Sequence, residues 1–283
     1  MENKDSKNVV VLFHAECPDG FGAAWAAWKK FGDEALYIPV HHNSEIPKGV
    51  EGKDVYTVDF SYKEDVTKSL LNQVKSLTII DHHISNKDIV KLAHDHVFDV
   101  NHSGAVLSWQ YFHPDKPVPL LLKYVEDIDI WKLELPYIKE IGEFLELVEF
   151  DFNLWSKVAS EFENKETFHK YLDQGVILYK KLEKSVHKSV NNARKIEFEG
   201  YECYLVNTAS YVSATLHALV GEMPPIAIAW SQRGDRMIFS LRSDGTVDVS
   251  ELAKKYGGGG HKNAAGFSWK DDSFLKFQDH RLS

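Results

Sequence analysis

Residues 78–83 read Thr-Ile-Ile-Asp-His-His, an apolar run that ends in one acid and two imidazoles. A short run rich in β-branched residues is typical of a buried strand, so we expect Asp81, His82 and His83 at a strand's C-terminal end. Two further apolar runs end in the same kinds of residue: 9–13 leads into His14, and 55–58 leads into Asp59. In an open α/β sheet, ligands bind beyond the carboxyl ends of the strands. The pattern therefore predicts a ligand site at that edge.

Carboxylates and imidazoles gathered at one sheet edge predict a site for divalent metal ions. Oxygen ligands mixed with imidazole suit Mn²⁺, Mg²⁺ or Fe²⁺ better than a structural zinc ion, which prefers thiolates and imidazoles. The residues that supply this mixture are His14, Asp19, Asp59, Asp81, His82 and Asp127. A paired site of this kind activates a water and binds a phosphoryl oxygen. We therefore expect a metal-dependent hydrolase.

The order of strand-like and helical segments indicates a βαβ arrangement and a mostly parallel sheet. The expected strands cover 8–13, 35–40, 54–58 and 76–80, and the expected helices between them cover 20–31 and 63–73. Ser103 suits the N-cap of a helix over 104–112. Only helices are expected from 137 to 194, the longest with apolar residues spaced by three and four.

Strand-like runs return near residue 195. They cover 196–198, 202–206, 225–230 and 236–242, with helices expected at 210–220 and 248–256. The 283 residues have room for two domains of ordinary size. The predicted fold class is α/β, with a mostly parallel-sheet N-terminal metal-binding domain (1–150), a helical connector (151–196) and a smaller C-terminal α/β domain with a mixed sheet (197–283).

Composition narrows the class of protein. Hydrophobic residues make up 43% and charged residues 27% of the chain, which is typical of a globular protein. No apolar stretch is long enough to span a bilayer, and the polar first residues do not resemble a secretory signal. Two cysteines, Cys17 and Cys203, are too few for a disulfide framework. We therefore expect a cytoplasmic protein without a membrane partner.

The net charge of −9 at pH 7 bears on the substrate. A protein that coats nucleic acid is usually basic, so a phosphate-bearing substrate must here be bound locally, by metal ions and a few cationic groups. This favours a short oligonucleotide or a nucleotide over a long duplex. The oligomeric state is left open, with a homodimer as one alternative.

The set of motifs resembles the DHH phosphoesterase superfamily, which is named for the sequence that stands here as Asp81-His82-His83. His14 with Pro18-Asp19-Gly20 resembles the first family motif, Asp59 the second and Asp127 the fourth. The run Gly257–His261, followed by 264–267, resembles the DHH-associated C-terminal domain of oligonucleotide-cleaving members. The resemblance covers nearly the whole chain.

The resemblance implies a role for each of these residues and one or two Mn²⁺ or Mg²⁺ ions. His14 and Asp59 would hold one metal ion. The other would be held by Asp19, Asp59, His82 and Asp127, with Asp59 bridging the two. Asp81 would support a ligand, and His83 would lie near the substrate phosphate.

Cys17 departs from the family pattern, which has a first aspartate at this position. Three interpretations stay open: Cys17 is a softer ligand that favours another metal, the longer side chain of Glu16 reaches in, or the first metal site is weak. We favour a weakened or altered first site. Cys17 is otherwise a small buried residue, as free cysteines often are.

The fourth motif offers more than one acid. Glu126, Asp127 and Asp129 lie in a helical segment, and a helix does not place all three on one face. The resemblance favours Asp127 as the ligand, and Asp129 stays the alternative.

The C-terminal glycine run predicts a contact with substrate. Consecutive glycines favour no regular element, so Gly258, Gly259 and Gly260 are expected to form a turn whose N–H groups approach a phosphate. His261 would bind a phosphoryl oxygen, and Arg242, at a strand end, offers a planar fork for the same purpose. With Asp81 and His83, these two side chains complete the expected catalytic set.

The expected activity is hydrolysis of phosphodiester bonds in short oligonucleotides or small nucleotides, exonuclease-like, with a metal-activated water as the nucleophile. Cyclic (di)nucleotide hydrolysis and dephosphorylation of 3′-phosphoadenosine 5′-phosphate are alternatives within the same chemistry. A nucleotide-binding sensor with weakened catalysis is the alternative from another class, and Cys17 motivates it.

Overall fold

The computed structural model describes residues 7–41 and 44–270 of the chain. The chain forms two compact units, Met1–Tyr179 and Lys180–Ser283. The division falls inside one long helix, α7 (Lys165–Asn191). Each unit has its own sheet and its own hydrophobic core.

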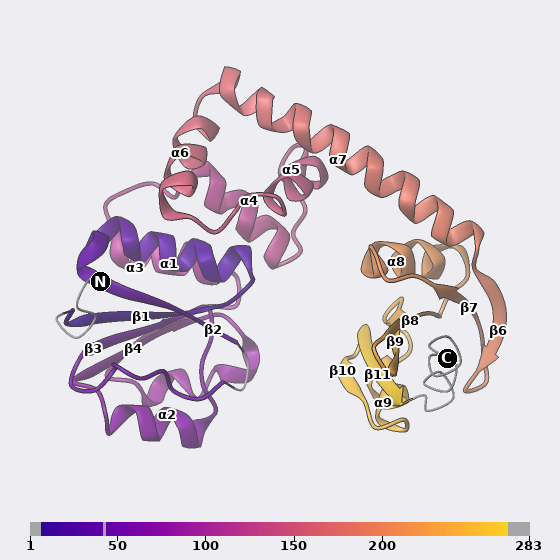
Figure 1. Cartoon of the computed structure of the whole chain (residues 1–283), viewed down its shortest axis with the longest axis horizontal. Coiled ribbons are helices and arrows are strands. Elements are labelled where there is room, and N and C mark those ends of the chain that lie inside the picture. Colours follow the sequence, from indigo (N-terminus) through magenta and orange to yellow (C-terminus); the bar gives the residue numbers. More distant parts are fainter. Residues whose placement is uncertain (1–6, 42–43, 271–283) are drawn as a thin grey trace, which may run out of the picture. The chain divides into compact units, whose positions relative to one another are not determined.

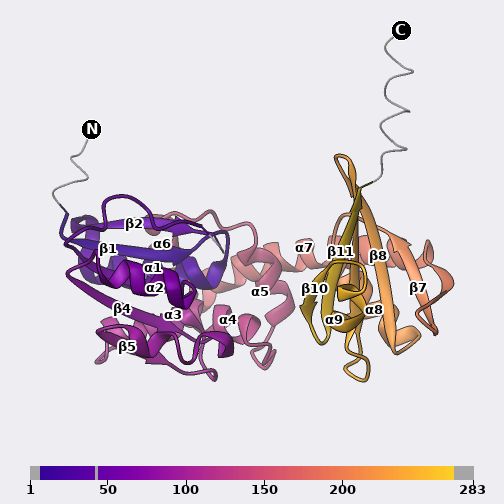
Figure 2. The same cartoon turned by 90° about the horizontal axis from the view of Figure 1, so that it is seen from below.

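The first unit is built on a five-stranded parallel sheet with the order β2-β1-β3-β4-β5, which Figure 2 shows from β2 to β5. The strands are β1 (Val9–His14), β2 (Ala35–Val40), β3 (Asp54–Val58), β4 (Ser76–Asp81) and β5 (Asp95–Phe98). The central strands are apolar on both faces, as expected where helices cover both sides of a sheet. The predicted parallel sheet is confirmed.

Helices cover the two faces of this sheet (Figure 1). Along β1, Val11 and Phe13 pack into the core beneath α1 (Pro18–Phe31) and α3 (Gly104–Phe112). The alternate residues Val10 and Leu12 pack into a second core with α2 (Glu64–Leu71). Three short 3-10 turns complete this part of the chain: Gly32–Glu34, Ile84–Asn86 and Val90–Leu92.

The middle of the chain is helical, as predicted. The helices α4 (Leu120–Asp129), α5 (Ile138–Leu145) and α6 (Phe152–Phe162) precede α7. Trp155 and Phe162, both buried, join α6 to the core shared with α1 and α3. Within the described ranges, no helix has both the length and the apolar character that crossing a membrane requires.

The strand order positions the candidate site. β1 is followed in the chain by its neighbour β2 on one side, and then by β3 on its other side. The chain therefore changes direction across the sheet at β1. In open α/β sheets, this switch point leaves a crevice at the carboxyl ends of the two strands.

The second unit has a six-stranded mixed sheet with the order β10-β11-β9-β8-β7-β6. Its strands are β6 (Arg194–Phe198), β7 (Tyr201–Asn207), β8 (Ile226–Arg233), β9 (Arg236–Ser243), β10 (Gly259–His261) and β11 (Ala264–Lys270). β7 and β8 pair in parallel, and the other neighbours pair antiparallel. The predicted mixed sheet is confirmed.

Two helices pack on this sheet. α8 (Val212–Glu222) packs with Ala227 and Ala229 of β8. The alternate residues Ile226 and Ile228 pack with α9 (Val249–Lys254). Alternate residues of a strand point to opposite faces, so α8 and α9 cover opposite faces of the sheet.

Candidate metal centre

Three neighbouring strands deliver side chains to one edge of the first sheet. His14 is the last residue of β1, Asp81 is the last residue of β4, and Asp59 directly follows β3. Phe13 pairs with Val58 in the sheet, so His14 and Asp59 emerge side by side. This is the arrangement that the apolar runs of the sequence predict.

His82 stands at the centre of the resulting cluster. Its Nε2 atom lies 3.2 Å from Asp59 Oδ1, 3.5 Å from Asp129 Oδ2 and 3.7 Å from Asp19 Oδ2. Asp59 Oδ2 lies 3.3 Å from His14 Nδ1. Asp59 therefore faces an imidazole with each of its two oxygens, which is the position that a bridging ligand requires.

The N-terminus of α3 fixes the position of Asp19. The backbone N–H groups of Gly104 and Ala105 donate to its two carboxylate oxygens, at 2.7 and 2.9 Å. A Cβ atom at position 104 would lie 2.5 Å from Asp59 Cβ, so only glycine allows the helix to approach this closely. The positive end of a helix favours a carboxylate at this place.

Burial and mutual repulsion act on the acids of the cluster. Burial, with the charges of Asp59 and Asp129, raises the pKa of Asp19 well above its usual range. Burial and the charge of Asp59 likewise raise the pKa of Asp129. Burial also disfavours the charged form of Asp59, but the neighbouring imidazoles of His14 and His82 outweigh it and lower the pKa of Asp59 to about 2. A divalent cation would relieve this concentration of negative charge.

The cluster fits a divalent metal ion. Asp59 Oδ1 and His82 Nε2 are buried, and neither has a hydrogen-bond partner of good geometry in the described part of the chain. A buried polar atom without such a partner is costly, and a cation would satisfy both. Among residues 7–41 and 44–270, three groups have ligand atoms within 4.8 Å of one another: His14 with Cys17 and Asp59, Asp19 with His82 and Asp129, and Asp59 with His82 and His83.

Asp81 supports the cluster through hydrogen bonds with His82 and His83. It is fully buried, and its Oδ1 accepts hydrogen bonds from the backbone N–H of His82 at 2.7 Å and of His83 at 3.0 Å. The same oxygen lies 2.8 Å from His83 Nδ1, and this hydrogen bond raises the pKa of His83. Ser61 and Asn86 donate to Oδ2. Asp81 therefore orients the two histidines that follow it.

The structure does not bring Asp127, the metal ligand expected from the sequence, into the cluster. Its carboxylate faces away from the cluster and accepts the backbone N–H groups of Glu134 and Leu135, at 3.0 to 3.1 Å. Asp129, two residues later, carries the carboxylate that reaches His82. Residues two apart on a helix do not share a face, so α4 directs one acid to the cluster and the other to the loop after the helix.

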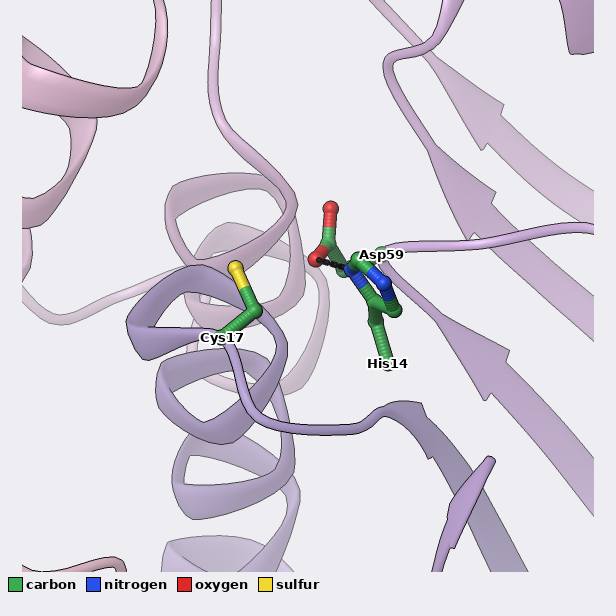
Figure 3. A group of neighbouring side chains, drawn as sticks. All are labelled: His14, Cys17 and Asp59. Atoms are coloured by element: carbon green, nitrogen blue, oxygen red, sulfur yellow. Dashed lines mark ion pairs between the residues drawn. The ribbon is translucent and has the colours of Figure 1, made fainter. Parts of the chain in front are cut away.

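Cys17 lies at the start of α1, with its thiol half-buried beside His14 and Asp59 (Figure 3). Burial raises the pKa of this thiol to about 11, so the metal-free thiol keeps its proton at neutral pH. Glu16 is exposed and belongs to none of the metal-binding groups found among residues 7–41 and 44–270. The interpretation in which Glu16 reaches into the site is therefore not supported.

Arg242 and His261 lie in the second unit, on one face of its sheet. Each pairs directly with Ala264 of β11 from opposite sides. Paired residues of antiparallel strands point to the same face, and two strand spacings separate the two side chains by about 10 Å. The Arg242 guanidinium donates to Ser213 Oγ at the start of α8.

The glycine run does not form the irregular turn that the sequence predicts. Gly259 and Gly260 belong to β10 and pair with β11. A Cβ atom at Gly258 would lie 2.1 Å from the carbonyl oxygen of Gly266, and one at Gly260 would lie 2.6 Å from that of Ala264. Close strand packing therefore explains these two glycines without a ligand.

Some contributors to the cluster are missed by reasoning from sequence. The backbone amides of Gly104 and Ala105 carry no side-chain signal, although the Ser103-Gly104 helix start is a typical anion site. The structure shows that Asp19 occupies this helix start. His102, just before it, instead lies 2.9 Å from Glu126 through its Nδ1 atom.

Comparison with known proteins identifies the C-terminal domain and the fold. Residues 212–280 match the DHHA1 domain family. The pGpG-specific phosphodiesterase PggH of Vibrio cholerae superposes with a TM-score of 0.59 at 14% identity, over 97% of each chain. RecJ of Thermus thermophilus, solved with Mn²⁺, gives a TM-score of 0.53 at 15% identity, over 98% of this chain and 52% of RecJ. Residues 212–280 therefore form a DHHA1 domain, and the chain as a whole has the fold of PggH and of the matching half of RecJ.

A relative with a known sequence is similar along most of this chain. It is the uncharacterized protein R106 of Acanthamoeba polyphaga mimivirus, which is 30% identical over 297 residues. The alignment covers 94% of this chain and 68% of R106.

Proposed function

We propose that this protein hydrolyses a phosphodiester bond of a short oligonucleotide or small nucleotide. The observation that carries the proposal is the cluster of Asp19, Asp59, His82 and Asp129, with His14 beside it, at the switch point of a parallel sheet; Asp19 and Asp59 are buried in it. One or two divalent ions, Mn²⁺ or Mg²⁺, would be held by these residues. When bound, such ions make a water nucleophilic at neutral pH and neutralise charge on a phosphoryl group.

The residues around the cluster would position the reacting groups. Asp59, with an imidazole at each oxygen, would bridge two ions. The backbone amides at the start of α3 hold the Asp19 carboxylate in place. His83, held at Nδ1 by Asp81, keeps Nε2 for a hydrogen bond to a phosphoryl oxygen. Donors fixed before the reaction stabilise developing charge more strongly than donors that must reorganise.

The second unit would bind the rest of the substrate. Arg242 and His261 share a face of the sheet, with the small side chain of Ala264 between them, which leaves room for an anionic group. Gly258, Gly259 and Gly260 would add backbone contacts beside them. We assign residues 1–150 to metal binding, 151–196 to the connector and 197–283 to substrate binding.

Two observations support a short substrate. The similarity to PggH extends over 97% of both chains, and the name of that protein specifies pGpG, a dinucleotide. The net charge of −9 disfavours a long polyanion. Two free cysteines, Cys17 and Cys203, agree with a cytoplasmic location.

The test is hydrolysis of a panel by protein stripped of metal and then reloaded with Mn²⁺ or Mg²⁺. The panel contains linear dinucleotides, pentanucleotides of RNA and DNA, cyclic dinucleotides and 3′-phosphoadenosine 5′-phosphate. We expect no turnover with chelator, recovery with Mn²⁺ and the highest kcat/KM for linear dinucleotides. Turnover that persists in chelator contradicts the metal-dependent mechanism, and tight nucleotide binding without turnover favours the sensor.

A further inference from the structure

The two parts of the metal cluster offer different donor atoms. Asp19, His82 and Asp129 supply oxygen and nitrogen, whereas His14, Cys17 and Asp59 supply nitrogen, sulfur and oxygen. Figure 3 shows the Cys17 sulfur and the Asp59 carboxylate directed into the same space, with the His14 ring against Asp59. The ligand atoms of this second set lie within 4.8 Å of one another, which is close enough for one ion to contact all three.

The local backbone positions the Cys17 side chain beside His14 and Asp59. Cys17 is the N-cap of α1, with extended dihedral angles (φ −131°, ψ 131°), and Pro18 follows it. Ser, Thr, Asp or Asn at an N-cap usually accepts a backbone hydrogen bond. Within the described chain, the Cys17 side chain makes no such cap. The sulfur is thus available at the mouth of the cluster.

A second observation points to a ligand at this place. Asp59 is almost completely buried, and its Oδ2, 3.3 Å from His14 Nδ1, faces this position, whereas its Oδ1 lies on the His82 side. Gly20, one turn into α1, brings the helix against the backbone of His14, where a Cβ atom would lie 2.2 Å from the carbonyl oxygen. This close contact fixes the distance between the first turn of α1 and the end of β1, and therefore between Cys17 and His14.

We propose that Cys17 Sγ, His14 and Asp59 form a soft metal position, selective for a Zn²⁺-, Co²⁺- or Fe²⁺-like ion, next to a hard position for Mn²⁺ or Mg²⁺. Thiolate and imidazole ligands favour the softer ions, whereas carboxylate-rich sites suit Mn²⁺ and Mg²⁺. Binding of the ion replaces the thiol proton, so each Cys17 that coordinates metal releases one proton. The inference rests on the proposed metal centre, but it requires no particular substrate.

The test is a titration of metal-free full-length protein with Co²⁺, followed by absorption spectroscopy. A thiolate ligand gives an intense near-ultraviolet charge-transfer band, which oxygen and nitrogen ligands lack. We expect this band in the wild type and its loss in both Cys17→Ser and Cys17→Asp. The matched control is Cys203→Ala, which removes the free thiol of the second unit and should keep the band.

The outcomes separate this inference from the proposed function. Bound Co²⁺ without the band in the wild type, or a band that survives in Cys17→Ser, overturns the soft position and leaves the metal-dependent hydrolase intact. No Co²⁺ binding at all overturns both. In a competition experiment, Zn²⁺ should remove the band at one equivalent whereas Mn²⁺ should leave it. Circular dichroism of the Cys17 variants confirms that loss of the band is not loss of fold.

Discussion

At the carboxyl edge of the first sheet, the side chains of Asp59 and His82 are 2% and 11% exposed and face one another. On the second sheet, Arg242 is half-buried and His261 is exposed. Buried charges of one sign are stable only with a counter-charge in place, so the first arrangement is committed to a cation. The second arrangement is more open to solvent and is suited to a ligand that binds reversibly. The contrast supports the proposal that the first unit carries the chemistry and the second unit binds substrate.

The largest effect should come from removing the bridging acid. Asp59→Asn keeps the size of the side chain but lowers its affinity for cations, so turnover with Mn²⁺ should fall by about 10²- to 10³-fold. Steady-state kinetics measure this effect, and circular dichroism should show an unchanged fold. Turnover within tenfold of the wild type would remove Asp59 from the bridging role.

A matched pair on α4 tests which acid belongs to the cluster. Asp129→Asn should lower turnover by about a hundredfold, whereas Asp127→Asn should keep turnover within a few-fold. Asp127 accepts backbone N–H groups of the next loop, so its variant should instead lose about 1–2 kcal/mol of unfolding free energy. Chemical denaturation and kinetics together separate the two residues, and the reverse pattern would restore Asp127 as the ligand.

Because α3 packs closely against the cluster, adding one methyl group at Gly104 should disturb the metal site. Gly104→Ala places a Cβ atom 2.5 Å from Asp59 Cβ, which should displace Asp59, weaken Mn²⁺ binding and cost about 1–3 kcal/mol of stability. Gly221→Ala on α8 is the control, because its Cβ meets no described atom within 4 Å. Calorimetric Mn²⁺ titration measures the difference, and equal affinities in the two variants would contradict the close approach.

The glycine run of the second unit offers the corresponding test. Gly258→Ala should destabilise the pairing of β10 with β11 by about 1–3 kcal/mol, because its Cβ would overlap the carbonyl of Gly266. Gly259→Ala has open space and should be stable. If Gly259→Ala nevertheless raises KM, the run contacts substrate in addition to packing. Mn²⁺ binding should be unchanged in both, since the metal cluster lies in the first unit.

The smallest effect is expected at the half-buried cationic group of the second unit. Arg242→Lys keeps the charge but loses the planar fork, so KM for an oligonucleotide should rise by about tenfold with a smaller change in kcat. Arg236→Lys, at the exposed start of the same strand, is the control. A fall in kcat instead of a rise in KM would place Arg242 with the reacting atoms.

The apolar runs before His14, Asp59 and Asp81 made most of the first sheet and the core of its site predictable. β5 was missed because its sequence, Asp-His-Val-Phe, is half polar, as an edge strand allows. β10 and β11 were missed because Gly and Ala have low strand propensity, and only the pairing of β11 with β9 and of β10 with β11 makes them strands.

Asp129 was left as the alternative for a different reason. Helical periodicity separates residues 127 and 129 but does not reveal which face of α4 meets the sheet. The packing of α4 on α1 and α3 decides this in three dimensions. The amides at the start of α3 are likewise backbone groups, which no pattern of side chains reports.

The hydrogen bonds from Gly104 and Ala105 to Asp19 have a practical consequence. Any cation that coordinates the Asp19 carboxylate changes the electron density at these two amide protons. Their nuclear magnetic resonance signals, and their rates of exchange with solvent deuterium, would therefore report the occupancy of the hard metal position. The protein thus carries its own probe of metal loading, in the backbone of a helix that supplies no side-chain ligand.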